Sequence, residues 1–194
     1  MRVWLSATLV ALLLAASACR RESPLHGAVL EPPTAAPDFT LTDHHGAPFT
    51  LSRARGNVVL LFFGFTSCPD ICPTTLGSIK SALLPLGTDA QRVRVAMVTV
   101  DGARDTPDVL GPFMAAFDPG FLGLSGTSQE LASVYRLYGI EVTRRDLPDS
   151  ALDYTIDHTA SLSVIDSAGL VREVFFHGTP LEQMTADLRL LLRE

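Results

Sequence analysis

The distribution of apolar and polar residues predicts two buried strands and two hairpins. The buried strands are the nearly continuous apolar runs 57–63 and 93–100, which are typical of strands covered on both faces of a sheet. In each hairpin, two runs of alternating apolar and polar residues flank a turn-rich segment. The paired runs are 39–41 with 49–51, and 161–165 with 170–175.

Apolar residues at helical spacing predict four helices between and after these strands. The third has a capping box at its start, because Glu130 follows Thr127 by three residues. The order of strands and helices predicts an α/β domain with a thioredoxin-like fold, in which helices flank a central mixed sheet and a hairpin lies near the N-terminus. The predicted helices are 73–84, 106–117, 127–138 and 181–191.

The N-terminus has the pattern of an export signal. Residues 1–18 carry a basic residue, Arg2, near their start and continue as a short apolar run that ends in Ala16-Ser17-Ala18, directly before Cys19. Small residues before a cysteine favour lipidation of Cys19, although the usual leucine three residues before the cysteine is replaced by Ala16. Plain secretion and an uncleaved membrane anchor are the alternatives.

The proline-rich residues 19–37 are interpreted as the lipid-anchor cysteine and a tether, and residues 38–194 as the folded domain. We therefore expect an exported protein, anchored in a membrane, with its domain facing the periplasm or the cell exterior.

The charge and the cysteine content limit which classes of function are expected. The formal net charge is only -6, and arginines account for 14 of the 15 basic residues and are scattered along the chain, so we expect no nucleic-acid surface. Once Cys19 is assigned to the anchor, Cys68 and Cys72 are the remaining thiols in an exported protein. In an oxidising compartment they form either one short disulfide or a pair of soft metal ligands.

The two cysteines lie in a loop that follows the first buried strand and precedes a helix. Open α/β sheets place their chemistry in such loops, and a helix N-terminus stabilises a thiolate. The four-residue spacing brings both sulfurs to one side of a helical turn, and Pro69 and Pro73 restrict the cysteine before each of them. This rigidity favours a preformed site.

Two thiolates suit Cu(I), and an added imidazole allows either Cu(I) or Cu(II). The residues alone do not say which of the five histidines contributes that imidazole. His26 lies in the predicted tether, and His44 and His45 lie in a turn. His158 directly precedes a predicted strand, and His177 lies near the start of the last helix.

Three segments together resemble the Sco/SenC family in their order and spacing. These are Gly64-Phe65-Thr66-Ser67-Cys68-Pro69-Asp70-Ile71-Cys72-Pro73, then Val100-Asp101 with Arg104-Asp105-Thr106-Pro107, and then Asp153-Tyr154 with Asp157-His158-Thr159. The resemblance covers nearly all of residues 38–194. It departs from the family pattern at Gly102, at Ser161-Leu162 and at Asp166-Ser167-Ala168-Gly169, none of which is a proposed ligand.

The resemblance implies a thioredoxin-like fold and a copper site made of Cys68, Cys72 and His158. It also implies a metallochaperone that helps to assemble the copper centre of cytochrome c oxidase, with oxidase subunit II as partner and a periplasmic copper donor or thiol reductant upstream. The alternative function is a tethered thiol-disulfide oxidoreductase in which Cys68 and Cys72 are the redox thiols.

Simpler interpretations apply to several of these residues. Cys68 and Cys72 can form a structural disulfide, and His158 can be an ordinary hydrogen-bonded histidine. Asp157 is as compatible with a structural role as with steering the His158 imidazole, because neighbouring side chains on an extended segment point in opposite directions. A peroxiredoxin site is disfavoured, because Phe65 and Leu61 occupy the positions where that class has Thr or Ser and Pro. The acidic and basic residues at 101, 104 and 105 are expected to fix a loop and cap the next helix.

Overall fold

The computed structural model describes residues 25–148 and 150–194, so the predicted signal peptide, Cys19 and the first part of the tether lie outside it. Within the described residues, eight strands form one mixed sheet and two more form a separate hairpin. The strands of the large sheet, in spatial order, are β1 (Ala28–Ala35), β10 (Leu170–Phe176), β9 (Ser161–Ile165), β4 (Val58–Gly64), β5 (Val93–Thr99), β6 (Leu122–Ser125), β2 (Thr40–Asp43) and β3 (Pro48–Thr50).

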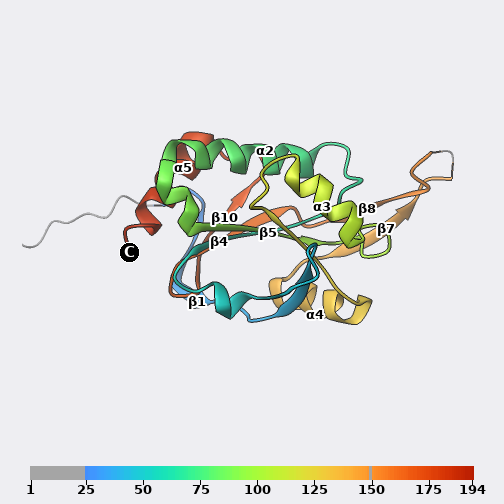
Figure 1. Ribbon diagram of the computed structural model, residues 1–194, viewed down its shortest axis with the longest axis horizontal. Coiled ribbons are helices and arrows are strands. Elements are labelled where there is room, and N and C mark those ends of the chain that lie inside the picture. The colour runs from blue at the N-terminus through green and yellow to red at the C-terminus, as the bar shows by residue number, and fades with distance from the viewer. Residues whose placement is uncertain (1–24, 149) are drawn as a thin grey trace, which may run out of the picture.

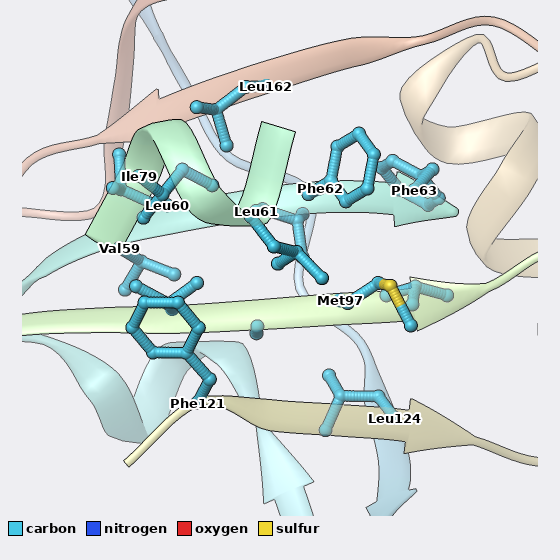
Figure 2. Close-up of a cluster of buried hydrophobic side chains, with 14 of the residues drawn as sticks. Val59, Leu60, Leu61, Phe62, Phe63, Ile79, Met97, Phe121, Leu124 and Leu162 are labelled. Carbon is cyan, nitrogen blue, oxygen red and sulfur yellow. The ribbon is translucent and has the colours of Figure 1, made fainter. Parts of the chain in front are cut away.

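The central strands β4 and β5 are parallel and in register from Val58 opposite Val93 to Gly64 opposite Thr99. Every residue of β4 is buried, as its continuous apolar run predicts. Figure 2 shows the apolar side chains of β4 and β5 packed together with Ile79 of the covering helix and Leu162 of β9. The carboxyl ends of both strands thus open at the same edge of a rigid core.

Helices cover both faces of the sheet, and the predicted mixed α/β architecture is confirmed. In Figure 1, α2 (Ile71–Leu83) and α5 (Leu181–Leu191) lie together over one face, and α4 (Ser128–Tyr138) lies on the other. The helix α3 (Pro107–Ala115) packs on β6. Both bonds of the predicted capping box at Thr127 are present. Two short 3-10 segments, Leu51–Ala54 and Leu84–Arg92, complete the helical structure. No helix in residues 25–148 or 150–194 is long and apolar enough to cross a bilayer.

The segment predicted as a tether contains a strand. β1 pairs with β10 at the edge of the sheet, with an irregular register between Val29 and Thr34. Pro32 and Pro33 fall within that irregular part, where no ladder hydrogen bond is required of them. The prediction that folded structure begins at residue 38 is therefore corrected, because the chain joins the sheet from Ala28 onward.

The start of this segment is attached to the domain by a buried acidic pair. The backbone N–H of Gly27 donates to Glu173 at 2.8 Å, and the backbone N–H of His26 donates to Asp187 at 2.8 Å. The His26 ring also contacts Asp187, with 2.6 Å between Nδ1 and Oδ1. His26 therefore lies against the domain rather than in a free tether.

A second difference from the prediction is the separate hairpin formed by β7 (Val142–Asp146) and β8 (Tyr154–His158). It projects from the body of the domain, at the right of Figure 1. His158 is the last residue of β8 and pairs with Val142, so the hairpin holds this histidine at its base.

Candidate metal centre

The loop after β4 places both cysteines at the carboxyl end of the central strand. The backbone N–H of Cys68 donates to the carbonyl oxygen of Phe65 at 3.3 Å, which closes a turn. The helix α2 then begins at Ile71, so that Cys72 lies in its first turn. Cys72 has no exposed surface, whereas Cys68 is partly exposed. Cys68 thus lies in the strand-to-helix loop, and Cys72 lies at the start of the helix that follows it.

The two sulfurs are neighbours without being bonded to each other. The backbone N–H of Cys72 donates to Sγ of Cys68 at 3.4 Å, and both cysteines are free thiols. The fold is therefore complete without a disulfide between them.

The environment makes the two thiols chemically unequal. A hydrogen bond from the Cys72 thiol to the Cys68 sulfur is the main cause that lowers the pKa of Cys68 to about 5. Backbone N–H groups and the nearby His158 act in the same direction, and partial burial opposes them. The same hydrogen bond, together with burial, raises the pKa of Cys72 well above the ordinary thiol value. Cys68 is consequently the accessible thiolate, and Cys72 is the buried thiol that stabilises it.

A glycine at the end of β4 makes room for the buried sulfur. A Cβ atom on Gly64 would lie 3.0 Å from Sγ of Cys72 and 2.6 Å from a ring carbon of Phe62. Gly64 is part of the cysteine motif in the sequence, but the motif alone does not indicate this role. The signal available was its position, directly after a fully buried strand and before the cysteine loop.

His158 lies close to the cysteine loop, and the β4 backbone orients its ring. Nε2 of His158 is 3.1 Å from the carbonyl oxygen of Phe63, and the ring meets that of Phe65 edge to face at 5.7 Å. A carbonyl oxygen only accepts, so Nε2 carries the proton. Nδ1 makes no hydrogen bond to any residue that the structure describes, which leaves its lone pair available for a metal ion. Metal-binding histidines commonly donate their other N–H to such a carbonyl.

The three predicted ligands are gathered in one region but not around one point. Among residues 25–148 and 150–194, no three His, Cys, Asp or Glu side chains are close enough together to hold a metal ion as they stand. The structure therefore brings Cys68 and Cys72 together and leaves His158 beside them. The donor set, two sulfurs and one imidazole, fits copper in either oxidation state.

Other candidate residues take structural roles. Asp157 points away from His158 and contacts exposed Arg145 at 3.2 Å on the neighbouring strand, so it does not steer the imidazole. Asp105 accepts hydrogen bonds in the cysteine loop, which confirms its predicted role in fixing a loop. Thr106 is the N-cap residue of α3, but no side-chain hydrogen bond caps that helix.

The remaining histidines and methionines stay outside the site. His177 is exposed, and the methionines at 97 and 114 are buried in the core. Nδ1 of His44 accepts a hydrogen bond from the backbone N–H of Gly123. His44 therefore has a structural role in the turn that contains it.

Known proteins that resemble this chain include Sco proteins and a protein named for copper binding. ScoI of Bradyrhizobium japonicum with copper bound is 36% identical, has a TM-score of 0.74, and is matched over 81% of this chain and 99% of its own. Apo Sco1 from Thermus thermophilus is also 36% identical, with a TM-score of 0.77 over 88% of this chain and 99% of that one. A putative copper-binding protein of Stutzerimonas stutzeri is 34% identical over 71% of this chain and 67% of its own length.

The SCO1/SenC family model matches residues 28–193, and so begins with β1 rather than after it. The solved relatives share the mixed sheet and its helices, which confirms the thioredoxin-like fold expected from the order of elements. The match covers well over half of the chain. The chain therefore belongs to the SCO1/SenC family.

Proposed function

We propose that this protein binds one copper ion through Cys68, Cys72 and His158 and delivers it during assembly of the copper centre of cytochrome c oxidase. The observation that carries the proposal is the adjacency of an accessible low-pKa thiolate, a second thiol and an imidazole with one available nitrogen. Copper is bound in the related ScoI of Bradyrhizobium japonicum. The Sco family is a family of cytochrome c oxidase assembly proteins, which supports the oxidase as the recipient, and the family resemblance implies its subunit II.

Transfer follows from the coordination that these residues can offer. Two sulfurs and one imidazole leave a copper ion with few ligands, so that donor atoms of a recipient can bind before the ligands of this protein leave. Anchoring through Cys19 would hold the site near a membrane-embedded oxidase. The anchor remains a prediction from the sequence.

Copper titration of the reduced protein tests the ligand set. We expect one Cu(I) or Cu(II) per chain in the wild type, and loss of tight binding in Cys68→Ala, Cys72→Ala and His158→Ala, because each removes one of three donors. Absorbance and electron paramagnetic resonance report the Cu(II) complex. His177→Ala is the control and should bind like the wild type, because this histidine is exposed and outside the site. Tight binding by all three ligand variants would exclude the proposed site.

The inequality of the two thiols favours thiol-disulfide exchange as a second candidate function. An accessible thiolate at Cys68 can attack a disulfide of subunit II, and Cys72 can then resolve the mixed disulfide, leaving this protein oxidised and the subunit reduced.

Alkylation of the copper-free, reduced protein measures this inequality. Because the pKa of Cys68 is lowered to about 5, its alkylation rate should be nearly constant above about pH 6, whereas Cys72 reacts slowly throughout. An alkylation rate of Cys68 that rises steadily up to pH 9 would contradict the prediction. His158→Ala separates the two functions: if it still reduces the subunit II disulfide but does not support oxidase assembly, copper delivery is the essential activity.

A further inference from the structure

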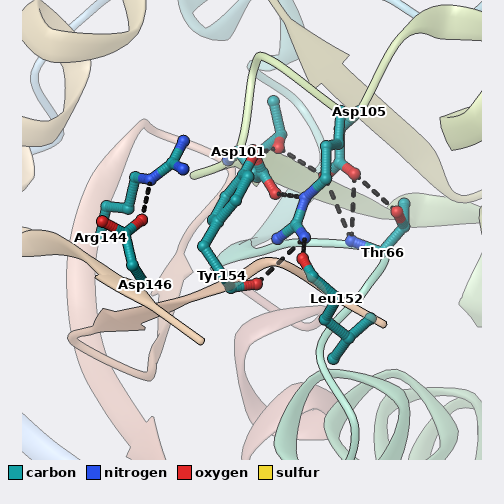
Figure 3. A network of polar contacts seen from close by, with 9 residues as sticks. Thr66, Asp101, Asp105, Arg144, Asp146, Leu152 and Tyr154 are labelled. Carbon is teal, nitrogen blue, oxygen red and sulfur yellow. Dashed lines mark hydrogen bonds and ion pairs between the residues drawn. The ribbon is translucent and has the colours of Figure 1, made fainter. Parts of the chain in front are cut away.

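We infer that the turn between β5 and α3, Asp101–Asp105, is a brace that sets the position of His158 relative to the two cysteines. The inference rests on the proposed copper site and assigns Asp101, Arg104 and Asp105 as positioning residues for it. It follows from two sets of contacts that diverge from this one turn. One set reaches the cysteine loop, and the other reaches the hairpin that carries His158 (Figure 3).

The first set of contacts fixes the entrance of the cysteine loop. The Asp105 carboxylate accepts from the backbone N–H of Thr66 at 3.1 Å and from the Thr66 hydroxyl at 2.6 Å. It also accepts from the hydroxyl of Thr99, at the end of β5, at 2.6 Å. Asp105 is almost completely buried, so these donors replace the water that its carboxylate lacks. Thr66 is two residues from Cys68, and its position therefore limits where the Cys68 sulfur can lie.

The second set holds the hairpin near its turn, where β8 begins. The Tyr154 hydroxyl donates to the Asp101 carboxylate at 2.8 Å. The Arg104 guanidinium donates to the carbonyl oxygens of Leu152 and Tyr154 at 3.0 and 3.1 Å, and it stacks on the Tyr154 ring at 3.7 Å. Arg144, on the opposite strand, stacks on the same ring at 3.7 Å. Tyr154 begins the strand β8 that ends at His158.

The two sets meet within one short, rigid turn. The backbone N–H groups of Arg104 and Asp105 both donate to the carbonyl oxygen of Asp101, at 3.1 and 2.9 Å. Arg104 forms an ion pair with the Asp101 carboxylate. The Thr99 hydroxyl links the two sets of contacts, because it donates to Asp105 and accepts from the backbone N–H of Asp101 at 2.9 Å. Asp101 and Asp105 are 3% and 1% exposed. A displacement at either end is therefore transmitted to the other through buried, charge-assisted bonds.

This geometry explains why the hairpin needs such support. β7 and β8 pair only with each other, so no ladder hydrogen bond ties this hairpin to the main sheet, although the carbonyl oxygen of Phe63 orients the His158 ring. The ligands are gathered but not yet around one point, so a small shift of the hairpin decides whether the imidazole reaches a copper ion held by the thiols. The brace sets the range of that shift.

The experiment uses one variant at each end of the brace, compared in the copper-loaded protein. Tyr154→Phe removes the hydroxyl that reaches Asp101 and keeps the ring. Thr66→Val removes the hydroxyl that reaches Asp105, and Thr66→Ser restores it. We expect Tyr154→Phe and Thr66→Val each to lower copper affinity roughly 10- to 100-fold, the range seen when support of a metal ligand is lost. Tyr154→Phe should also change the Cu(II) resonance spectrum, and Thr66→Ser should return affinity to the wild-type value.

Arg145→Gln is the matched control on the same hairpin. It breaks an exposed ion pair with Asp157 and leaves the brace intact, so its affinity and spectrum should equal those of the wild type. The inference is overturned if Tyr154→Phe and Thr66→Val lose thermal stability but keep the wild-type affinity and spectrum. If the wild type itself binds no copper, the proposed function fails instead, and the two failures are thereby distinguished.

Discussion

Replacing Gly64 with alanine is expected to weaken copper binding at least about tenfold while the fold is retained. The added methyl group would lie 3.0 Å from Sγ of Cys72 and 2.6 Å from the Phe62 ring, both fully or almost fully buried. Both neighbours are packed in the core, and overpacking of this kind costs about 1–3 kcal/mol. The displaced sulfur would then no longer face Cys68 correctly. Competition with a Cu(I) chelator measures the affinity, at a temperature below the melting transition of each protein.

Gly77→Ala is the matched control. Gly77 lies within α2, and a Cβ atom there would meet nothing within 4 Å. Alanine also favours the helix by roughly 0.5–1 kcal/mol over glycine. This variant should melt slightly higher than the wild type and bind copper equally well. Wild-type copper affinity in Gly64→Ala would show that the close approach of Cys72 to the strand is unimportant.

Replacing Glu173 with glutamine is expected to stabilise the protein at pH 8. Glu173 is completely buried, accepts from the N–H of Gly27 and lies beside the buried carboxylate of Asp187. Burial is the main cause that raises the pKa of Glu173 from 4.5 to about 7, and the neighbouring Asp187 adds to it. One oxygen of Glu173 has no hydrogen-bond partner among the described residues, whereas a protonated carboxyl group can donate to Asp187.

The sign of the pH dependence follows from this raised pKa. Between about pH 5 and 7 the folded protein holds a proton on Glu173 that the unfolded chain has released, so the free energy of unfolding falls as pH rises. The shift corresponds to about 3 kcal/mol, most of it lost by pH 8. Glutamine keeps the acceptor for Gly27 and donates to Asp187 at every pH, so this part of the decline should disappear.

Urea denaturation at pH 5, 6, 7 and 8 measures this effect. The control is Glu141→Gln, which neutralises an exposed glutamate and should keep the wild-type decline. The explanation is wrong if Glu173→Gln declines with pH as steeply as the wild type. The titratable side chains next to Glu173, which are those of His26 and Asp187, are the same in both variants.

Apolar periodicity predicted most of the core elements because burial dictates those residues, but it missed the four-residue strand β6. The run 57–63 forms a strand that is buried throughout, and the helix after it buries its apolar residues against the sheet. β1 was missed because two prolines argue against a strand. They are tolerated here only because β1 lies at an edge with an irregular register. The hairpin β7–β8 was missed because β7 is largely polar and exposed, so no alternation marks it.

The candidate site was predictable only in part. Cys68 and Cys72 follow from their spacing and their loop, while His158 came from resemblance to a family. The carbonyl oxygen of Phe63 that orients His158 lies 95 residues away along the chain. The contact between Tyr154 and Asp101 spans 53 residues. No local pattern encodes such pairings, since they arise only when the sheet brings distant segments together.

The irregular strand β1 has a further consequence for how neighbouring molecules meet. An unprotected edge strand offers a row of backbone groups to which another chain can add, which leads to aggregation. Here one edge is β1, with Pro32 and Pro33, and the other is β3, which begins with Pro48. Proline has no N–H to donate, so both edges of the main sheet interrupt a growing ladder. Many copies crowded together on one surface would therefore resist joining edge to edge.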